Sequence, residues 1–151
     1  MTKLKFIIGI IFMLLFIGLV MILAGNSILL IVDIASFVIT VAVPYILVSL
    51  IYSPKEQNRM VSGILSTLPA DRQLLKKGIA YLNSLKTLIV LTGLLGTLLG
   101  TISILVNLEN PDALGPNFSV ALITVLYAIM YVIIIIEPLK ASAEKKLVSE
   151  E

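Results

Sequence analysis

The hydrophobic residues of this 151-residue sequence fall into four long runs, separated by one polar segment and two short turn-forming stretches. The runs cover residues 6–24, 28–52, 87–107 and 118–136, and the shortest have 19 residues. About 20 apolar residues, at about 1.5 Å each, cross a hydrocarbon core of about 30 Å. The pattern therefore predicts an all-α membrane protein with four transmembrane helices, organised as a single membrane domain over residues 1–151.

The first run has a second interpretation, as a secretory signal, because Lys3 and Lys5 precede it. The apolar core of a signal peptide usually has about 7–15 residues. The run at 6–24 is longer than that, so we expect a retained helix.

The polar segment at 53–86 is broken by Pro54 and Pro69, and each half repeats apolar residues at helical spacing. Such spacing predicts two short amphipathic helices that lie against the membrane helices or extend them. Their apolar faces consist of Val61, Ile64, Leu65 and Leu68 in the first half and Leu75, Ile79, Leu82 and Leu85 in the second. Residues 25–27 and 108–117 are expected to form turns, and 137–151 a polar tail.

The composition agrees with a membrane protein, since 59% of the residues are hydrophobic and 13% are charged. The sequence contains no Cys and no His, which excludes disulfides, Cys or His metal sites and His-based catalysis. No glycine-rich phosphate loop lies between a strand and a helix. We therefore expect no enzyme activity, no cofactor, no metal site and no binding of nucleic acid.

The basic residues fix an orientation. All eleven Lys and Arg residues lie at the start of the chain, in the segment at 53–86 or in the tail. With four spans, these three regions share one side of the membrane, and the positive-inside rule makes that side cytoplasmic. Both termini and the middle segment are thus expected in the cytoplasm, with the turns at 25–27 and 108–117 outside.

The third run carries small residues on one helical face, at Gly93, Gly96, Gly100 and Ser103. The fourth run has a matching face of Ala121, Thr124 and Ala128. Small residues let membrane helices pack closely, and hydroxyls in such a seam also line ion paths. Thr97 lies about 15 Å from the inner end of its run, near the midplane. The sequence leaves both interpretations open, with packing assigned to the small residues and an ion path to Thr97 and Thr124.

Two further residues stand out in the second run. Asp33, about a turn and a half after its start, is interpreted as a capping charge near the interface, because a carboxylate is stabilised by a helix N-terminus. Pro44 removes one backbone hydrogen bond and is expected to kink the helix.

Three sequence segments resemble the MotA/TolQ/ExbB proton-channel family. They are GTLLG at 96–100, ALITVLYAIMYVIIIIEPL at 121–139 and DIASFVITVAVPYILVSLIYSP at 33–54. In this comparison Thr97 matches the family's threonine on the third span, Gly93, Gly96 and Gly100 match its glycines, and Pro138 matches its terminal proline. The pattern differs on the fourth span, where the family's threonine falls at Val125, a hydroxyl is offered one residue earlier by Thr124, and the glycine is replaced by Ala128.

The resemblance implies a multi-pass protein of the bacterial cytoplasmic membrane that forms a pentameric ring around single-span partners of the MotB/ExbD/TolR kind. It also implies that a partner aspartate takes up the ion. The sequence is therefore interpreted as the channel-forming subunit of a motor or energy-transducing complex driven by protons or sodium ions. One alternative is a non-conducting assembly scaffold of the same fold. A small four-span exporter is less favoured, because such exporters need a carboxylate within the membrane and the first run of this sequence carries no charge.

Overall fold

The computed structural model describes residues 2–68 and 71–149, and every regular element in them is helical. Three of the elements are short irregular turns of helix, marked η. In chain order the elements are α1 (Lys3–Leu23), the 3-10 turn η1 (Ile28–Ile31), α2 (Ile34–Phe37), the π-helical turn η2 (Val38–Ala42), α3 (Val43–Ser49), α4 (Pro54–Leu65), α5 (Arg72–Val106), α6 (Pro111–Tyr131), the π-helical turn η3 (Val132–Ile136) and α7 (Glu137–Ser149).

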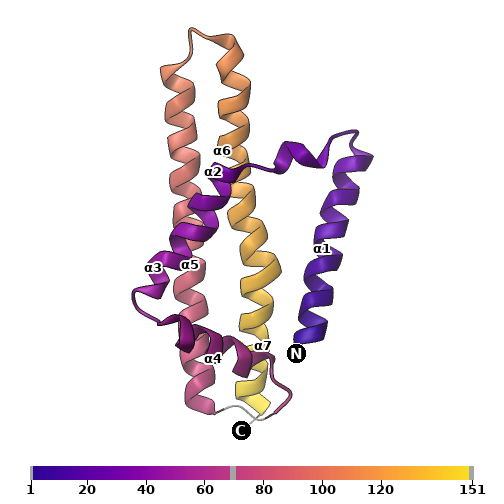
Figure 1. Cartoon of the computed structure of the whole chain (residues 1–151), viewed down its shortest axis with the longest axis vertical. Coiled ribbons are helices and arrows are strands. Elements are labelled where there is room, and N and C mark those ends of the chain that lie inside the picture. The colour runs from indigo at the N-terminus through magenta and orange to yellow at the C-terminus, as the bar shows by residue number, and fades with distance from the viewer. Residues whose placement is uncertain (1, 69–70, 150–151) are drawn as a thin grey trace.

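Two long antiparallel helices form the centre of the molecule (Figure 1). The first is α5, with 35 residues, and the second is the continuous helix of 39 residues made by α6, η3 and α7. At about 1.5 Å per residue each is more than 50 Å long. A hydrocarbon core of about 30 Å leaves one end of each helix outside the lipid.

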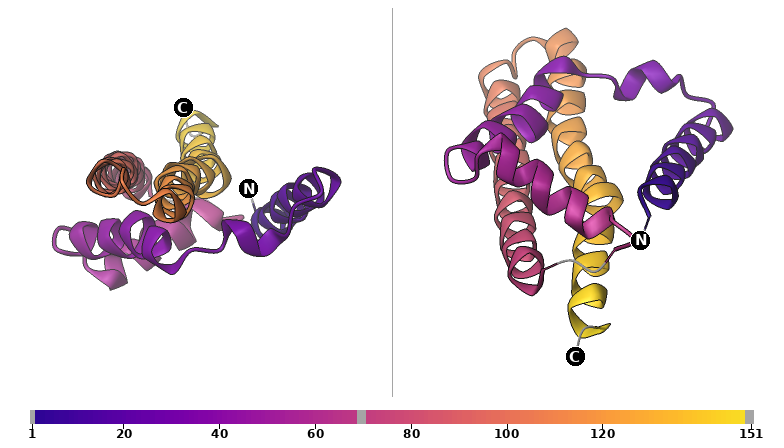
Figure 2. Two further views of the ribbon diagram at one scale, coloured as in Figure 1. Left: turned by 90° about the horizontal axis from the view of Figure 1, so that it is seen from above. Right: turned by 60° about the horizontal axis from the view of Figure 1, so that its bottom comes forward.

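The segment α2–η2–α3 packs across one face of the α5–α6 pair, and the chain then bends by 106° into α4 (Figures 1 and 2). This elbow has a built-in cap, because Ser53 and Glu56 satisfy each other's backbone N–H groups and Pro54 occupies the first turn. The buried Gln57 side chain donates to Ser49 Oγ at 2.9 Å and to the Tyr52 carbonyl at 2.8 Å. It accepts a hydrogen bond from the Tyr81 hydroxyl of α5 at 3.1 Å.

The best-packed apolar core lies at the end of the molecule that holds α4. It is formed mainly by residues of α4, the first half of α5, η3 and α7, with Ile64, Leu75, Leu82, Ile89 and Ile136 fully buried. Lys146 of α7 closes this region by donating to the carbonyls of Gly63 and Ser66 at the C-terminal end of α4. The remaining surface is rich in exposed Leu, Ile, Val and Phe, as expected for helices in lipid.

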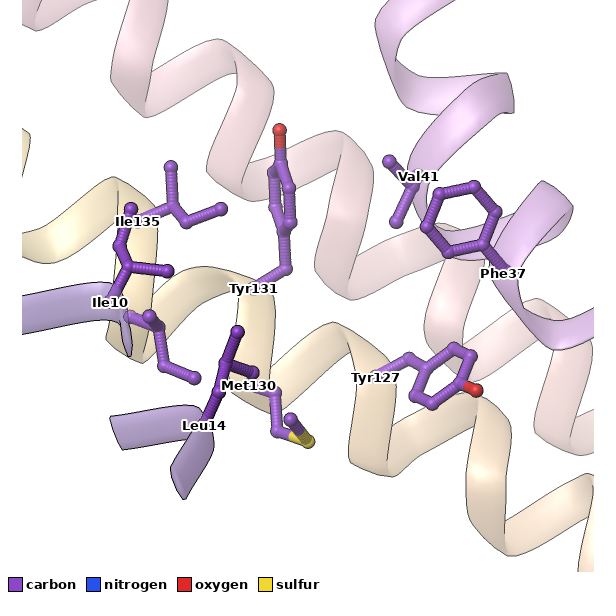
Figure 3. Close-up of a pocket in the computed structure, with 9 residues that line it drawn as sticks. Ile10, Leu14, Phe37, Val41, Tyr127, Met130, Tyr131 and Ile135 are labelled. Atoms are coloured by element: carbon purple, nitrogen blue, oxygen red, sulfur yellow. The ribbon is translucent and has the colours of Figure 1, made fainter. Parts of the chain in front are cut away.

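Helix α1 stands apart from the other helices, and none of its residues is buried (Figures 1 and 2). Between α1, α2, η2 and the α6–η3 helix lies an apolar pocket of about 290 Å³ (Figure 3). Ile10 and Leu14 border it from α1, and Phe37, Tyr127 and Tyr131 from the other elements.

By length and composition, three helices can cross a membrane: α1, α5 and the continuous α6–η3–α7 helix. A fourth crossing is counted if the bent pair Ile34–Ser49 and Pro54–Leu65 represents one span. The chain is therefore a multi-pass membrane protein.

The second hydrophobic run differs most from the expectation. It was expected to be one helix over 28–52, but the helix begins at Ile34, after η1 and a break at Val32–Asp33. Asp33 is the N-cap of α2 and not a residue inside a helix, because its carboxylate accepts the Ser36 N–H at 2.6 Å. The expected capping interaction is present, at a helix start further along the chain.

Pro44 lies in the first turn of α3, directly after the π-helical turn η2. A widened turn of this kind accommodates the hydrogen bond that a proline cannot donate.

Of the two arrangements expected for the second amphipathic stretch of 53–86, the structure has the extension, since this stretch is the first part of α5 and continues into the third hydrophobic run. Two boundaries outside the second run differ from the expectation. The turn expected at 108–117 is shorter, since Asn110 caps α6 and Pro111 occupies its first turn. The tail at 137–151 is helical as α7 through Ser149, and Pro69 lies outside the described residues.

Candidate functional site

The glycine seam of α5 faces small residues of α6. A Cβ added to Gly93 would lie 2.5 Å from Ala128 Cβ, and one added to Gly100 would lie 2.7 Å from Ala121 Cβ. A Cβ on Gly96 would lie 2.3 Å from Thr124 Cγ2. Real carbon contacts require about 3.5–4.0 Å. The two backbones are thus closer than any larger residue at these three positions would allow.

Ser103 lies outside this contact, with an exposed side chain. It borders a small groove of about 180 Å³ between α2, α5 and α6. Ser36, Asn117 and Thr124 line the same groove, so its walls carry several polar groups.

Thr124 is buried on the side of α6 that faces α2, with 1% of its surface exposed. Its hydroxyl donates to the Val120 carbonyl at 2.7 Å. It also lies 3.0 Å from the hydroxyl of Ser36, which is completely buried. A threonine hydroxyl has one proton to donate, so these two partners satisfy it within the chain.

One turn further along α6, Tyr127 holds the start of α2. Its hydroxyl donates to the carbonyl of Ile31 and accepts the backbone N–H of Asp33 at 3.0 Å. These backbone groups lie at the break between η1 and α2, where no helix supplies partners. Unpaired backbone groups are costly in lipid, so the Tyr127 hydroxyl stabilises the break.

Thr97 lies on a different side of the α5–α6 pair from Thr124. Its hydroxyl donates to the Gly93 carbonyl at 3.1 Å and to the Ala121 carbonyl of α6 at 3.0 Å, and the side chain is half-buried. Helical spacing places Thr97 on one stripe with Val90 and Leu94. These two residues border a groove of about 390 Å³ together with Val125 of α6.

The structure therefore does not bring the two predicted ion-path threonines onto one surface. Thr124 packs against α2, whereas Thr97 lies beside the face that carries Val125. Ser36 and Tyr127 were not predicted as site residues. Ser36 had a weak signal, a hydroxyl three residues after Asp33 in an apolar run, but the sequence holds no sign of which helix it contacts.

Pro138 lies in the first turn of α7, just beyond the apolar part of the long helix. The adjacent Glu137 forms a salt bridge with Lys86 of α5. This pair joins the two long helices where the polar sequence begins. Within residues 2–68 and 71–149, no three His, Cys, Asp or Glu side chains are placed to hold a metal ion.

A family model described as the MotA/TolQ/ExbB proton channel family matches residues 41–148, which include the end of η2, the helix α3 and all of α4 to α7 except Ser149. This is more than two thirds of the chain. The chain belongs to the MotA/TolQ/ExbB family.

Shorter matches to individual proteins agree with this assignment. The chain is 41% identical over 58 residues to Uncharacterized protein YtxD of Bacillus subtilis, covering 38% of this chain and 21% of that protein. It is 60% identical over 35 residues to Motility protein A of Aquifex aeolicus, covering 23% of this chain and 14% of that protein. It is 42% identical over 53 residues to Motility protein A of Borreliella burgdorferi, covering 35% of this chain and 20% of that protein. The matches thus span about a fifth or less of each relative's length.

Among solved structures, that of C. jejuni MotAB is similar with a TM-score of 0.81 at 14% identity. The alignment covers 99% of this chain and 84% of that chain. At this identity the similarity establishes the fold, and it includes α1, which lies outside the range of the family match.

Proposed function

We propose that this chain is the channel-forming subunit of an ion-driven membrane complex. The observation that carries the proposal is the α5–α6 pair, in which a glycine–alanine seam holds two long helices together and places Thr97 beside an open face. Membership of the proton-channel family supports it. The complex consists of a pentameric ring of this chain and a single-span partner of the MotB/ExbD/TolR kind, and it is driven by protons or sodium ions.

The proposed topology has four spans and cytoplasmic termini, in the cytoplasmic membrane of a bacterium. Both ends of the described chain lie at the same end of the molecule as α4 (Figure 1). All the basic residues belong to that end: the start of α1, the helix α4, the first part of α5 and the helix α7. The opposite end carries Glu109 and Asp112, so the positive-inside rule assigns it to the outside, and Asp33 lies nearer the middle of the molecule, beside Tyr127.

In this proposal Thr97 contacts the ion or the partner's carboxylate, whereas the small residues serve packing. A hydrogen bond to a charged group contributes about 1.5–3 kcal/mol, more than the average of about 0.6 kcal/mol for a hydrogen bond between membrane helices. Thr97→Val keeps the volume and removes the hydroxyl. We expect normal assembly and an ion flux lowered by about 10- to 100-fold.

The matched control is Thr92→Val on the same helix. Thr92 is buried and its hydroxyl donates only to carbonyls of its own helix, those of Leu88 and Ile89. Flux is measured in vesicles that hold the ring, its partner and a pH- or sodium-sensitive dye. Unchanged flux in Thr97→Val would reject the proposed role of this hydroxyl.

The ion-path role of Thr124 stays a prediction. Its burial against Ser36 favours a packing role, so Thr124→Val tests it separately in the same assay. If the Thr124 hydroxyl lines the ion path, Thr124→Val lowers the ion flux without changing the stability of the protein. In that case Val125→Thr does not raise the flux.

A second candidate function is a non-conducting scaffold of the same fold. Val125 favours it, because an apolar side chain borders the open face where the family pattern has a threonine. Absence of flux from the parent ring with its own partner would favour the scaffold over the channel.

A further inference from the structure

An apolar groove of about 330 Å³ lies between α1 and the long α6–α7 helix, and Lys5, near the start of α1, borders it. Its walls include Lys5, Gly9 and Met13 of α1 and Ile133 and Pro138 of the facing helix. This groove contains neither Thr124 nor Thr97, and its only wall residue that also borders the face carrying Val125 is Ile133.

The groove has the depth of one lipid leaflet. Lys5 and Met13 are eight residues apart on a continuous helix, which corresponds to about 12 Å. Half of a hydrocarbon core of about 30 Å is about 15 Å. The groove therefore runs from the headgroup level toward the middle of the bilayer.

The width of the groove suits a single hydrocarbon chain. A volume of about 330 Å³ over a depth of about 12 Å holds a chain of methylene groups, whereas a helix with its side chains is about 10–12 Å wide. Gly9 forms part of the wall, and no heavy atom lies within 4 Å of the position that a Cβ would take there. A helix of a second copy is too thick for this space, but an acyl chain is not.

The mouth of the groove is positively charged. Lys5 borders it, and among the described residues no carboxylate forms an ion pair with this lysine. Glu137, next to Pro138, is occupied by its salt bridge with Lys86. An anionic headgroup thus meets a cation whose charge is not already compensated.

From these observations we propose that the groove binds one anionic phospholipid of the cytoplasmic leaflet, with an acyl chain along Gly9 and the phosphate at Lys5. The proposal rests on the membrane topology of the proposed function. It does not depend on ion conduction, and the test below measures no flux.

The sequence contains no Trp, so a single tryptophan introduced at Phe6, which lines this groove and none of the other grooves described above, is a specific reporter. The full chain is reconstituted in vesicles in which either phosphatidylglycerol or phosphatidylcholine carries brominated acyl chains that quench the tryptophan. We expect phosphatidylglycerol to bind about fivefold more tightly at this site, since one basic residue near the surface contributes about 1 kcal/mol. Tryptophan at Ile8, an exposed position at a similar depth on α1, should show no preference.

Two pairs of variants, made with the Phe6→Trp reporter, separate the contribution of the headgroup from that of the acyl chain. Lys5→Gln should abolish the preference for phosphatidylglycerol, whereas Lys3→Gln, outside the groove, should keep it. Gly9→Phe should fill the groove and lower quenching by both lipids, whereas Ile11→Phe, on a position that does not border it, should not.

Equal quenching by the two lipids, or a preference that survives Lys5→Gln, would overturn the proposal. Protection of the reporter from both lipids in the assembled ring would also overturn it, because a second copy would then cover the groove.

Discussion

The contact between Gly96 and Thr124 allows a quantitative test of the α5–α6 seam. In Gly96→Ala the new Cβ would lie 2.3 Å from Thr124 Cγ2 and 3.2 Å from Ile39 Cγ2. Relief of the first contact to a normal 3.5–4.0 Å requires a shift of about 1.2–1.7 Å. Overpacking of this kind costs about 1–3 kcal/mol, so we expect the unfolding equilibrium constant to rise by about 5- to 150-fold.

A second substitution identifies the cause. Thr124→Ser removes Cγ2 but keeps the hydroxyl that lies beside Ser36, so the double variant should regain most of the lost stability. Gly18→Ala is the control, because its Cβ would meet only Ile28 Cδ1, at 3.5 Å.

The free energy of unfolding is measured by SDS titration in mixed micelles, followed by the near-UV circular dichroism of the tyrosines. The reasoning is refuted if Gly96→Ala differs from the parent by less than about 0.5 kcal/mol, the range of substitutions that disturb no packing. It is also refuted if Thr124→Ser does not rescue the variant.

Two further predictions concern the topology and the elbow at α4. Single cysteines introduced at Ser27 and Asn110 should be labelled from outside the cell, and a cysteine at Lys145 should be labelled only from the cytoplasm. Labelling of the cysteine at Lys145 from outside would contradict the four-span topology. Burial raises the pKa of Tyr81 to about 12, so its contribution to stability is complete below about pH 10, the ordinary tyrosine value, and is lost as the pH rises toward 12. Tyr81→Phe leaves the buried Gln57 oxygen without its hydrogen-bond donor and should lower the free energy of unfolding by about 1–3 kcal/mol. It should also remove the loss of stability that ionisation of Tyr81 causes at alkaline pH. If the stability of Tyr81→Phe depends on pH as that of the parent does, this role of Tyr81 is contradicted.

The sequence predicted features that depend on local periodicity. The four apolar runs, the close packing of Gly93, Gly96 and Gly100 and the capping by Asp33 all follow from spacing within one segment. The sequence does not decide whether the polar stretch after Asp71 forms a separate helix or the first part of α5. An amphipathic pattern is the same in both cases.

Contacts between distant segments could not be predicted in this way. The break before α2 depends on Tyr127, which is 94 residues from Asp33, and the partner of Thr124 is Ser36, 88 residues away. The hydrophobic run continues through the break, so hydropathy alone places the helix start too early. A Tyr hydroxyl in the fourth span that pairs two backbone groups of the second run has no signature in either segment.

The shift of the fourth-span hydroxyl from position 125 to 124 has a geometric consequence that sequence alignment alone does not show. Neighbouring residues of an α-helix point about 100° apart, because each turn has about 3.6 residues. At 124 the hydroxyl faces Ser36 and the methyl group faces Gly96 of α5, whereas at 125 the side chain borders the open face near Thr97. The one-residue shift therefore exchanges a position on the proposed ion path for a position in a packing contact. Because Thr124 and Ser36 satisfy each other without Val125, the change Val125→Thr adds a hydroxyl to the open face while the buried pair stays intact. A gain of flux in that variant would show that the open face conducts and that its conduction is limited by the missing hydroxyl.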